Sequence, residues 1–478
     1  MMRIAIIGAG CSGTLVCRSL VPEARKGLVA AVTIFEASGD FGPGLPYGSG
    51  TTADSFLLNM TASTLGIGEP PDDFLDWLTS QGHAGGYAPR RMFGQYLRTA
   101  LANTVRDLAD AAVDVRRVHG EVSDIRKTAG GYTVVSPAGG MVFDRVVLAT
   151  GHLRKISPFG LNERYFANPY HALAGIAHTI PEDASVGIIG SKLTAIDMAL
   201  HLRDQGIRRI HMLSHSGRLP LVRGVMPDGG DFRTALPLQP RASVRHFLRH
   251  FAASRPFAAE YPGFFTLSDP RLRLDLEIEA ARQVRPWQLY LDGTKHAIDS
   301  YWQAMDAQQK RLFQRKYRGL WMSCRHPMPL DNALRIRQML DEGRLFIHRG
   351  YRSMTRQHEG FSAQLSTTSL PLDYVIDATG VSGNIGHIDD PLVARLIDNG
   401  LLAQHPAGGI RMEPDSFRVA GEPGLFAIGP LTQGTWFYVS AVERLKVHAS
   451  ELTSAMVQSM HAAPSQARYA LHSTPSSC

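Results

Sequence analysis

Short apolar runs that end in small residues recur along the chain, and each one predicts a buried parallel strand. The first run covers 4–7 and is followed by a glycine-rich turn and a helix-like pattern at 14–20. Further runs lie at 32–35 and 145–148. Strands of a parallel sheet are buried on both faces, so their residues are apolar throughout instead of alternating. The first third of the chain is therefore predicted to contain a parallel sheet covered by helices.

The same succession of strand, turn and helix returns at 186–202, and another strand follows at 209–213. An apolar strand at 373–376 ends in Ala-Thr-Gly, repeating a turn that occurs earlier in the chain. A late strand at 424–428 leads into a helix from 439 to about 460. The chain is therefore predicted to hold a second Rossmann-like unit.

The stretches between these units follow other patterns. Residues 113–124 and 132–135 are predicted to be strands of a small β-meander. Apolar residues at helical spacing indicate amphipathic helices at 72–78, 87–111, 242–252, 277–284, 295–305 and 332–341. We expect Trp287, Trp302 and Trp321 to pack in the core between such helices.

The turn after the first strand has the composition of a dinucleotide-binding turn. Gly8, Gly10 and Gly13 follow the order G-x-G-x-x-G between a strand and a helix. The first glycine makes the turn, the second admits a pyrophosphate, and the third lets helix and strand pack closely. Glu36 ends the next strand, where a carboxylate can accept ribose hydroxyls. Its slightly long spacing is consistent with a loop at 22–27.

The second unit departs from this pattern at one position. Gly190 keeps the turn and Ala195 can replace the third glycine, but Lys192 stands where the second glycine is expected. The lysine either obstructs a pyrophosphate or places an ammonium beside it, since it can swing outward. Ser214 and Arg218 lie in the loop that receives the 2′-phosphate of NADPH in such units, unless Arg218 is only a solvated cation.

Composition limits the possible classes. The 478 residues are 44% hydrophobic and 19% charged, as in ordinary globular proteins with two or three domains. No apolar run is long enough to span a membrane, and the first strand begins too early for a signal peptide, so we expect a cytoplasmic protein. The net charge of +7 is scattered along the chain. The four cysteines form neither a C-x-x-C pair nor a metal-ligand cluster, which argues against a disulfide-exchanging flavoenzyme.

These features together resemble the two-dinucleotide-binding-domain flavoproteins. The FAD/NAD(P)-binding proteins are especially similar in five segments, which span nearly the whole chain. They are Gly42-x-Gly44-Leu45-x-Tyr47, Leu57-Leu58-Asn59-Met60, Pro89-Arg90-x-x-Phe93-Gly94-x-Tyr96-Leu97, Arg325-His326-x-Met328 and Gly429-Pro430-Leu431-Thr432-x-Gly434-Thr435. Among relatives of known chemistry, the chain resembles class B flavin monooxygenases, including amine N-hydroxylases.

The resemblance implies an α/β fold with two Rossmann-like dinucleotide-binding domains, a small β-meander and a helical insertion. It divides the chain into a discontinuous FAD-binding domain (1–155 and 371–460), an NAD(P)-binding-like domain (156–222 and 345–370), a helical insertion (223–344) and a flexible tail (461–478). The cofactor-binding residues that it implies are Gly8, Gly10, Ser12, Gly13, Glu36, Asn59, Met60, Val122, Thr150, Gly151, Gly190, Lys192, Ser214, Arg218, Gly380, Gly429, Leu431 and Thr432.

Several of these positions have specific expected roles. Val122 would bond adenine through its backbone, and the Leu431 N–H would serve the ribityl chain where many flavoproteins have an aspartate. Asn59 is the candidate catalytic residue, because a neutral amide could hydrogen-bond the flavin or its oxygen adduct. The alternative role for Asn59 is an N-cap of the following helix.

The sequence thus favours an FAD-dependent, NADPH-dependent monooxygenase that uses molecular oxygen on a small amine or other soft nucleophile. One alternative is a flavin dehydrogenase or oxidase that inserts no oxygen. Another is a non-catalytic FAD-binding scaffold or RNA-binding flavoprotein. We expect no metal, no membrane association and no nucleic-acid partner for the favoured function, and the sequence leaves the oligomeric state open.

Overall fold

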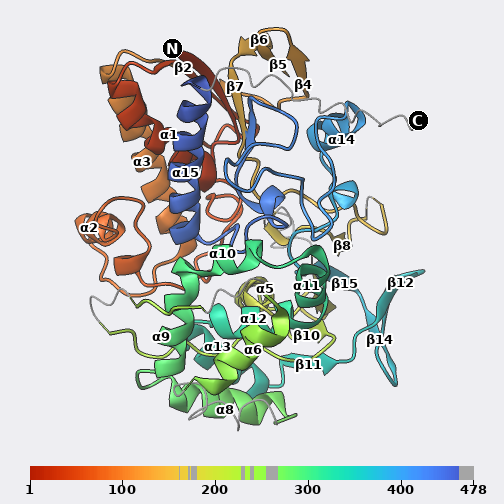
Figure 1. Ribbon diagram of the computed structural model, residues 1–478. Coiled ribbons are helices and arrows are strands. Elements are labelled where there is room, and N and C mark those ends of the chain that lie inside the picture. Colours follow the sequence, from red (N-terminus) through yellow and green to blue (C-terminus); the bar gives the residue numbers. More distant parts are fainter. Residues whose placement is uncertain are drawn as a thin grey trace, which may run out of the picture.

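Two parallel sheets form the frame of the molecule, and each has five strands within the described residues (Figure 1). The computed structural model describes residues 1–160, 162–170, 173, 180–227, 232–236, 242–254 and 267–461. The first sheet has the order β16-β7-β1-β2-β3. Its strands are β1 (Met2–Ile7), β2 (Val29–Glu36), β3 (Asp114–His119), β7 (Arg145–Leu148) and β16 (Leu425–Ala427).

Helices cover the first sheet because its central strand is apolar on both faces. Ile4 and Ile6 of β1 are fully buried. Helix α1 (Cys11–Arg25) packs against both α3 (Arg90–Asp110) and α15 (Val442–His461), and the three lie side by side in Figure 1. An antiparallel meander packs nearby, formed by β4 (Asp124–Thr128), β5 (Gly131–Ser136) and β6 (Gly139–Phe143).

The second sheet has the order β11-β10-β9-β15-β8. Its strands are β8 (Tyr165–Phe166), β9 (Ser185–Ile189), β10 (Arg209–Ser214), β11 (Leu345–Arg349) and β15 (Tyr374–Asp377). Helices α5 (Leu193–Asp204) and α13 (Leu330–Asp341) contribute to its core. A hairpin extension, visible at the right of Figure 1, consists of β12 (Ser353–Gln357), β13 (Gly360–Gln364) and β14 (Ser369–Leu372).

The predicted helical insertion is confirmed, and its tryptophans are buried. Trp287, Trp302 and Trp321 share one hydrophobic cluster with Phe247 and Tyr438, as predicted for core residues. The helices of this region are α6 (Val244–Ala253), α8 (Pro270–Ala280), α9 (Pro286–Gly293), the 3-10 turn Thr294–His296, α10 (Ile298–Gln303), α11 (Ala307–Leu312), a π-helical turn (Phe313–Tyr317) and α12 (Arg318–Arg325).

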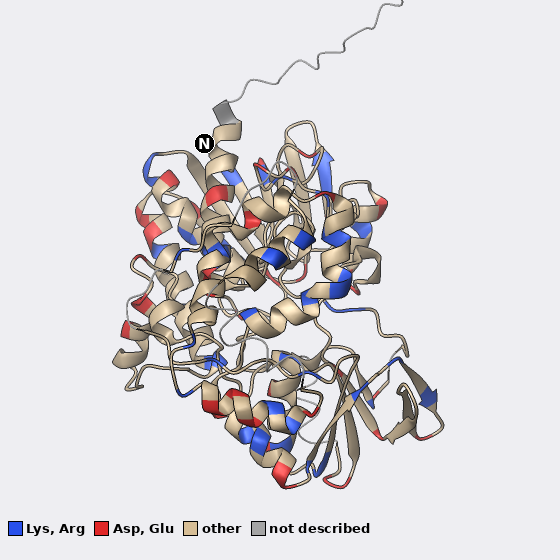
Figure 2. Ribbon diagram, turned by 60° about the horizontal axis from the view of Figure 1, so that its bottom comes forward, with Lys and Arg blue, Asp and Glu red and all other residues tan. Residues whose placement is uncertain are grey.

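Smaller elements complete the described chain. They are α2 (Asp73–Ser80), α14 (Pro391–Asp398) and three 3-10 turns at Ala62–Thr64, Ile385–His387 and Pro430–Thr432. In the described residues no helix is both long enough and apolar enough to cross a membrane. Basic and acidic residues are interspersed over both sheets and the helices (Figure 2). The predicted flexible tail lies almost entirely outside the described residues.

The structure corrects three local predictions. The strand expected at the start of 113–124 is β3, which pairs with β2 in the parallel sheet and does not belong to the meander. The loop expected at 22–27 is helical up to Arg25 although it contains Pro22, because Val21 and Ala24 of the same helix are buried in the core. The helix expected at 277–284 begins at Pro270, where the Asp269 carboxylate accepts the amide of Arg271 at 2.8 Å and caps it.

One domain boundary is also wrong. The predicted FAD-binding domain includes the residues from 371 onward, but β15 pairs with β9 and β8 of the second sheet. The chain rejoins the first core later, through residues such as Ile385 and Leu396. An apolar pattern predicts that a strand is buried but does not identify the sheet that contains it. The sequence could therefore not decide between the two sheets. The rest of the division stays a prediction.

A buried ion pair joins the two units. Arg90, at the start of α3, lies 2.9 Å from the carboxylate of Asp197 in α5. The two side chains are 13% and 3% exposed. Burial raises the pKa of Asp197 to about 6 despite the opposing effect of Arg90. Each charge therefore depends on its partner, because neither has enough water to replace it.

We predict that Arg90→Ala lowers the free energy of unfolding by about 3–5 kcal/mol, since it leaves Asp197 buried without a counter-charge. Arg91→Ala is the matched control. Arg91 pairs with Asp54 at the surface, with side chains 46% and 74% exposed, so its loss should cost about 0.5 kcal/mol or less. Chemical denaturation of both variants measures the difference. Equal, small effects would contradict the structural role of the Arg90 pair.

Candidate cofactor and active site

The first glycine turn is built as the fingerprint requires. Gly8 has φ +101°, and a Cβ there would collide with the carbonyl oxygen of Ala149 on the neighbouring strand. A Cβ on Gly13 would collide with the carbonyl of Gly8. These contacts agree with the roles predicted for the first and third glycines, namely a tight turn and close packing of helix on strand.

The second glycine faces another loop of the protein. A Cβ on Gly10 would lie 3.1 Å from Cα of Gly44, and one on Gly44 would lie 2.9 Å from Cα of Gly10. The amide of Gly42 donates to the carbonyl of Ala9 at 2.8 Å, which holds this loop against the turn. The Gly42–Gly44 segment is thus part of the same site, and space for a phosphate here depends on both glycines.

Glu36 is held beside the turn by three hydrogen bonds. One carboxylate oxygen accepts the amide of Ala9 at 2.9 Å. The other accepts the amide and the hydroxyl of Ser38 at 3.1 and 2.8 Å. The next strand, β3, ends opposite Glu36, and Val122 lies in the loop beyond it. The structure therefore brings the predicted ribose and adenine contacts to one edge of the sheet.

Unsatisfied polar groups at this edge fit a bound ligand. The buried hydroxyl of Thr150 has no hydrogen-bond partner among the described residues. Within the same residues, the backbone N–H and C=O groups of Val122 and the N–H of Leu431 are also without partners. Buried polar groups are rarely left unpaired in folded proteins. The positions predicted to contact FAD thus have donors and acceptors available for it.

The late glycine turn closes the site at its other end. Gly429 has φ +89°, and a Cβ there would lie 3.3 Å from the Ser12 hydroxyl at the start of α1. The Thr432 hydroxyl donates to the carbonyl of Gly429 at 2.8 Å. The predicted positions Ser12, Gly429 and Thr432 are therefore neighbours, although more than 400 residues of chain separate the first from the others.

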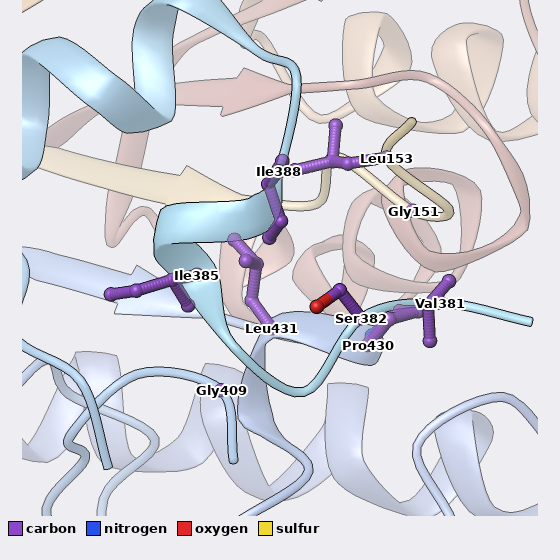
Figure 3. Close-up of a pocket in the computed structure, with 9 residues that line it drawn as sticks. All are labelled: Gly151, Leu153, Val381, Ser382, Ile385, Ile388, Gly409, Pro430 and Leu431. Carbon is purple, nitrogen blue, oxygen red and sulfur yellow. The ribbon is translucent and has the colours of Figure 1, made fainter. Parts of the chain in front are cut away.

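A cavity lies at this end of the predicted FAD path (Figure 3). We call it the first cavity. Gly151 borders it from one side and Pro430 and Leu431 from another. The aliphatic side chains of Leu153, Ile385, Ile388, Val381 and Leu431 form much of its wall, and the hydroxyl of Ser382 lies among them. Aliphatic side chains of this kind disfavour water in the part of the cavity that they line.

Asn59 has no capping role. The following 3-10 turn begins at Ala62, and its N-cap is Thr61. Among the described residues, the Asn59 side chain forms no hydrogen bond. Its neighbour Met60 places its sulfur 3.7 Å from the guanidinium of Arg223. The N-cap alternative is therefore wrong, while the proposed contact of Asn59 and Met60 with the cofactor stays a prediction.

The second glycine turn repeats the geometry of the first. Gly190 has φ +128°, and a Cβ there would lie 2.8 Å from the carbonyl oxygen of Ala378. Gly8 and Ala149 are related in the same way, and Ala195 is fully buried where the third glycine would pack. Gly380, which follows β15, has open space around it. Gly380 thus belongs to the second turn and not to the first, as its sheet assignment requires.

The prediction that Lys192 swings outward is wrong. Its ammonium donates to the carbonyl of Arg218 at 3.1 Å and to the hydroxyl of Ser323. Burial, together with the nearby cations Arg218 and Arg273, lowers the pKa of Lys192 to about 8. Lys192 is therefore a partly buried cation whose ammonium is held in place at the start of α5.

Hydroxyl groups link this lysine to the predicted phosphate loop. The Ser191 hydroxyl donates to the carbonyl of Arg218 at 2.8 Å and lies 3.1 Å from the hydroxyl of Ser214. The Ser214 hydroxyl in turn accepts the amide of Gly217 at 3.0 Å. The structure thus brings together Lys192, Ser214 and Arg218, as the sequence predicts, and adds Ser191, which sequence reasoning missed.

A buried charge cluster was also missed by the sequence. Asp292 lies 2.7 Å from Arg223 and 2.9 Å from Arg325, and Arg325 also lies 3.2 Å from Glu443. Both arginine side chains are 2% exposed. The only sequence signal was Arg325 within the family-like Arg-His-x-Met segment. Through Met60 and Glu443 the cluster ties the helical insertion to the first domain.

The described residues offer little for metal binding or disulfide chemistry. Within the described chain, no group of three or more His, Cys, Asp or Glu side chains is placed to hold a metal ion. Cys11, Cys17 and Cys324 are free thiols. Burial raises the pKa of each of these thiols to about 12, so none is activated as a thiolate.

Comparison with known proteins agrees with this geometry. Residues 5–153 match a family model described as FAD-NAD(P)-binding. They form an FAD/NAD(P)-binding domain. This match covers the first glycine turn, Glu36 and Thr150, which are the residues placed along one edge of the first sheet. A search of curated proteins finds no match.

Solved structures match almost the whole chain. The ornithine hydroxylase PvdA from Pseudomonas aeruginosa has a TM-score of 0.58 at 16% identity, over 96% of this chain and 99% of that one. The ornithine N-hydroxylase KtzI of Kutzneria sp. 744 has a TM-score of 0.58 at 16% identity, over 97% and 100%. The cadaverine monooxygenase DfoA from Erwinia amylovora has a TM-score of 0.56 at 14% identity, over 100% and 99%. The fold is therefore that of flavin monooxygenases, which confirms the fold predicted from the sequence.

We predict that Gly10→Val abolishes FAD binding, because its side chain would enter the narrow space between Gly10 and Gly44. Gly50→Ala is the control, since a Cβ there meets nothing within 4 Å. Flavin absorbance per polypeptide after purification and after addition of FAD measures the effect. A folded Gly10→Val protein that retains a full complement of FAD would contradict the assignment of this turn.

Proposed function

We propose that the protein is an NADPH-dependent FAD monooxygenase that oxygenates a small amine or another soft nucleophile. The observation that carries the proposal is the pair of matching glycine turns at the carboxyl ends of two parallel sheets. One turn has a carboxylate for ribose hydroxyls, and the other has cations and hydroxyls for phosphates. An ornithine hydroxylase and a cadaverine monooxygenase are among the solved enzymes of this fold, and they support an amine substrate.

The second turn suits NADPH more than NADH. Arg218 lies past the second strand of its unit, and its backbone carbonyl is fixed by Ser191 and Lys192. The N-terminus of α5 adds a partial positive charge. These groups would hold the pyrophosphate and the 2′-phosphate, and the Lys192 ammonium would favour the diphosphate.

The first domain would hold FAD, which supplies the redox chemistry when bound. The chain's own residues position the cofactor and control its surroundings. Glu36 would orient the ribose, Thr150 would donate its free hydroxyl, and Leu431 would offer its amide to the ribityl chain. The apolar side chains of the first cavity would keep water from the reacting atoms.

Other parts of the sequence-based hypothesis belong to the same proposal. Molecular oxygen and a small molecule are the expected reaction partners. A cytoplasmic location and the absence of a nucleic-acid partner stay predictions. Asn59 stays the candidate catalytic residue, because its amide has no other partner among the described residues.

The deciding experiment reduces the FAD-loaded protein with NADPH without oxygen and then admits oxygen while the flavin spectrum is recorded. A monooxygenase should be reduced by NADPH and should reoxidise with incorporation of oxygen into an added amine. Rapid reoxidation with release of hydrogen peroxide alone would favour an oxidase. The absence of reduction by either nicotinamide cofactor would overturn the proposal and favour a reaction in which the substrate itself reduces the flavin.

We predict that Arg218→Ala raises the KM for NADPH about ten- to a hundredfold and the KM for NADH much less, because a charge-assisted contact with the 2′-phosphate is lost. Arg208→Ala is the control at the opposite end of β10, where Arg208 pairs at the surface with Glu182. Steady-state flavin reduction measures both cofactors. Equal effects of Arg218→Ala on NADPH and NADH would assign Arg218 to structure.

We predict that Lys192→Met weakens NADPH binding and makes it less dependent on salt, because the held ammonium no longer attracts the diphosphate. In the unaltered protein, affinity should also fall as the pH rises through about 8, where Lys192 loses its proton. The methionine variant should lack this component of the pH profile. Lys26→Met, at the surface of the first domain, controls for net charge. Tighter NADPH binding by Lys192→Met would show that the lysine obstructs the site.

A further inference from the structure

A second cavity lies between the helical insertion and the chain that follows the late glycine turn. We call it the aromatic cavity. Its walls come from the π-helical turn, from α12 and from 433–441. Four aromatic side chains line it, namely Phe313, Trp321, Phe437 and Tyr438. An apolar, planar group is the natural occupant of such walls.

Hydrogen bonds hold these walls in place. The indole N–H of Trp321 donates to the Tyr438 hydroxyl at 2.8 Å, and the indole of Trp302 donates to the carbonyl of Gly434 at 3.2 Å. Phe437 packs edge-on against Trp321, with ring centroids 5.9 Å apart. The cavity is therefore shaped by fixed side chains and not by loosely packed ones.

The charge of the aromatic cavity is one-sided. Arg318 and His326 line it, and none of the described lining residues is aspartate or glutamate. Arg318 reaches solvent, and its side chain has no hydrogen bond or ion pair among the described residues. Protein atoms nevertheless crowd it enough to lower its pKa. Burial, with help from Arg325 and Arg223, lowers the pKa of His326 to about 3, so this imidazole is neutral.

Three acidic side chains near this region already have cationic partners. Asp299, which accepts the amide of the lining residue Phe437 at 3.0 Å, contacts Arg444. Asp292 contacts both Arg223 and Arg325, and Glu443 contacts Arg325. A substrate ammonium entering the aromatic cavity would find no free carboxylate among the described residues. A substrate carboxylate would find the Arg318 guanidinium, whose planar donor set matches carboxylate geometry.

One hydrogen bond joins the lining of the aromatic cavity to that of the first cavity. Gln433 lines the aromatic cavity, and its amide donates to the carbonyl of Ser382 at 3.2 Å. Ser382 lines the first cavity. The five-residue π-helical turn supplies Phe313 and leads directly into Arg318. Such turns within helices occur frequently at functional sites.

We propose that the aromatic cavity binds a small carboxylate with an aromatic or similarly apolar body, and that Arg318 receives the carboxylate. The inference that this ligand is the substrate to be oxygenated rests on the proposed function, whereas its binding does not. The substrate class would then be an aryl or apolar acid that carries an oxidisable nitrogen or sulfur. A simple diamine would be excluded, because nothing in the described lining balances a second ammonium.

The test compares two probes of the same shape and opposite charge, 3-phenylpropanoate and 3-phenylpropylamine. Calorimetry on the FAD-loaded protein measures binding, and tryptophan fluorescence reports occupation next to Trp321. We expect the carboxylate to bind at least about tenfold more tightly than the amine, as one charge-assisted contact provides. Arg318→Gln should remove this preference and Arg318→Lys should restore part of it.

Arg311→Gln is the matched control, because Arg311 is an exposed arginine of the preceding helix that does not line the cavity. It should keep the preference. Equal or tighter binding of the amine, no binding of either probe, or unchanged carboxylate binding by Arg318→Gln would each overturn the proposal. Circular dichroism of each variant separates lost binding from lost folding. Failure of NADPH to reduce the flavin would reject the monooxygenase function but leave the carboxylate site standing, so the two failures are distinguishable.

Discussion

The close approach of backbone to backbone at the two glycine turns is the constraint on which the rest of the structure depends. At Gly8 and at Gly190 the chain leaves a central strand in a left-handed conformation and passes against the carbonyl of the residue that directly follows the adjacent strand. Any side chain at either position would separate those strands. Because the turn sits so close to the sheet, the following helix begins directly above the strand ends, and its free N–H groups face the edge where phosphates can bind.

Buried charge then fixes the two sheets and the helical insertion relative to one another. Arg90 and Asp197 join α3 to α5, and Asp292 joins two arginines of the insertion. Replacement of such pairs by apolar side chains of similar volume is often neutral or stabilising, whereas removal of one partner is costly. These pairs therefore contribute more to the relative position of the elements than to stability. Apolar surfaces can shift against each other, whereas a paired guanidinium has to keep its contact with the carboxylate.

Local sequence signals predicted what local interactions determine. The strands at 4–7 and 32–35, the roles of Gly8 and Gly13, and the burial of the insertion's tryptophans all follow from spacing and side-chain type. The prediction of the sheet to which β15 belongs was wrong, because burial alone does not identify a partner strand. The predicted direction of the Lys192 side chain was wrong for a similar reason. Its ammonium is held by Ser323, a residue 131 positions away.

The position of that lysine bears on how the two dinucleotide sites could act together. An ammonium on the surface would be screened by solvent, whereas one held beside α5 keeps its field within the site, because the surrounding protein responds less to charge than water does. The cost of holding it is visible in its lowered pKa, which burial and two neighbouring arginines produce. An anionic diphosphate placed there would relieve that cost, since it would stabilise the protonated lysine that burial disfavours. On the proposed function, an anion bound at the second turn would stabilise it, and its departure from the glycine pattern would favour ligand binding rather than mark a lost site.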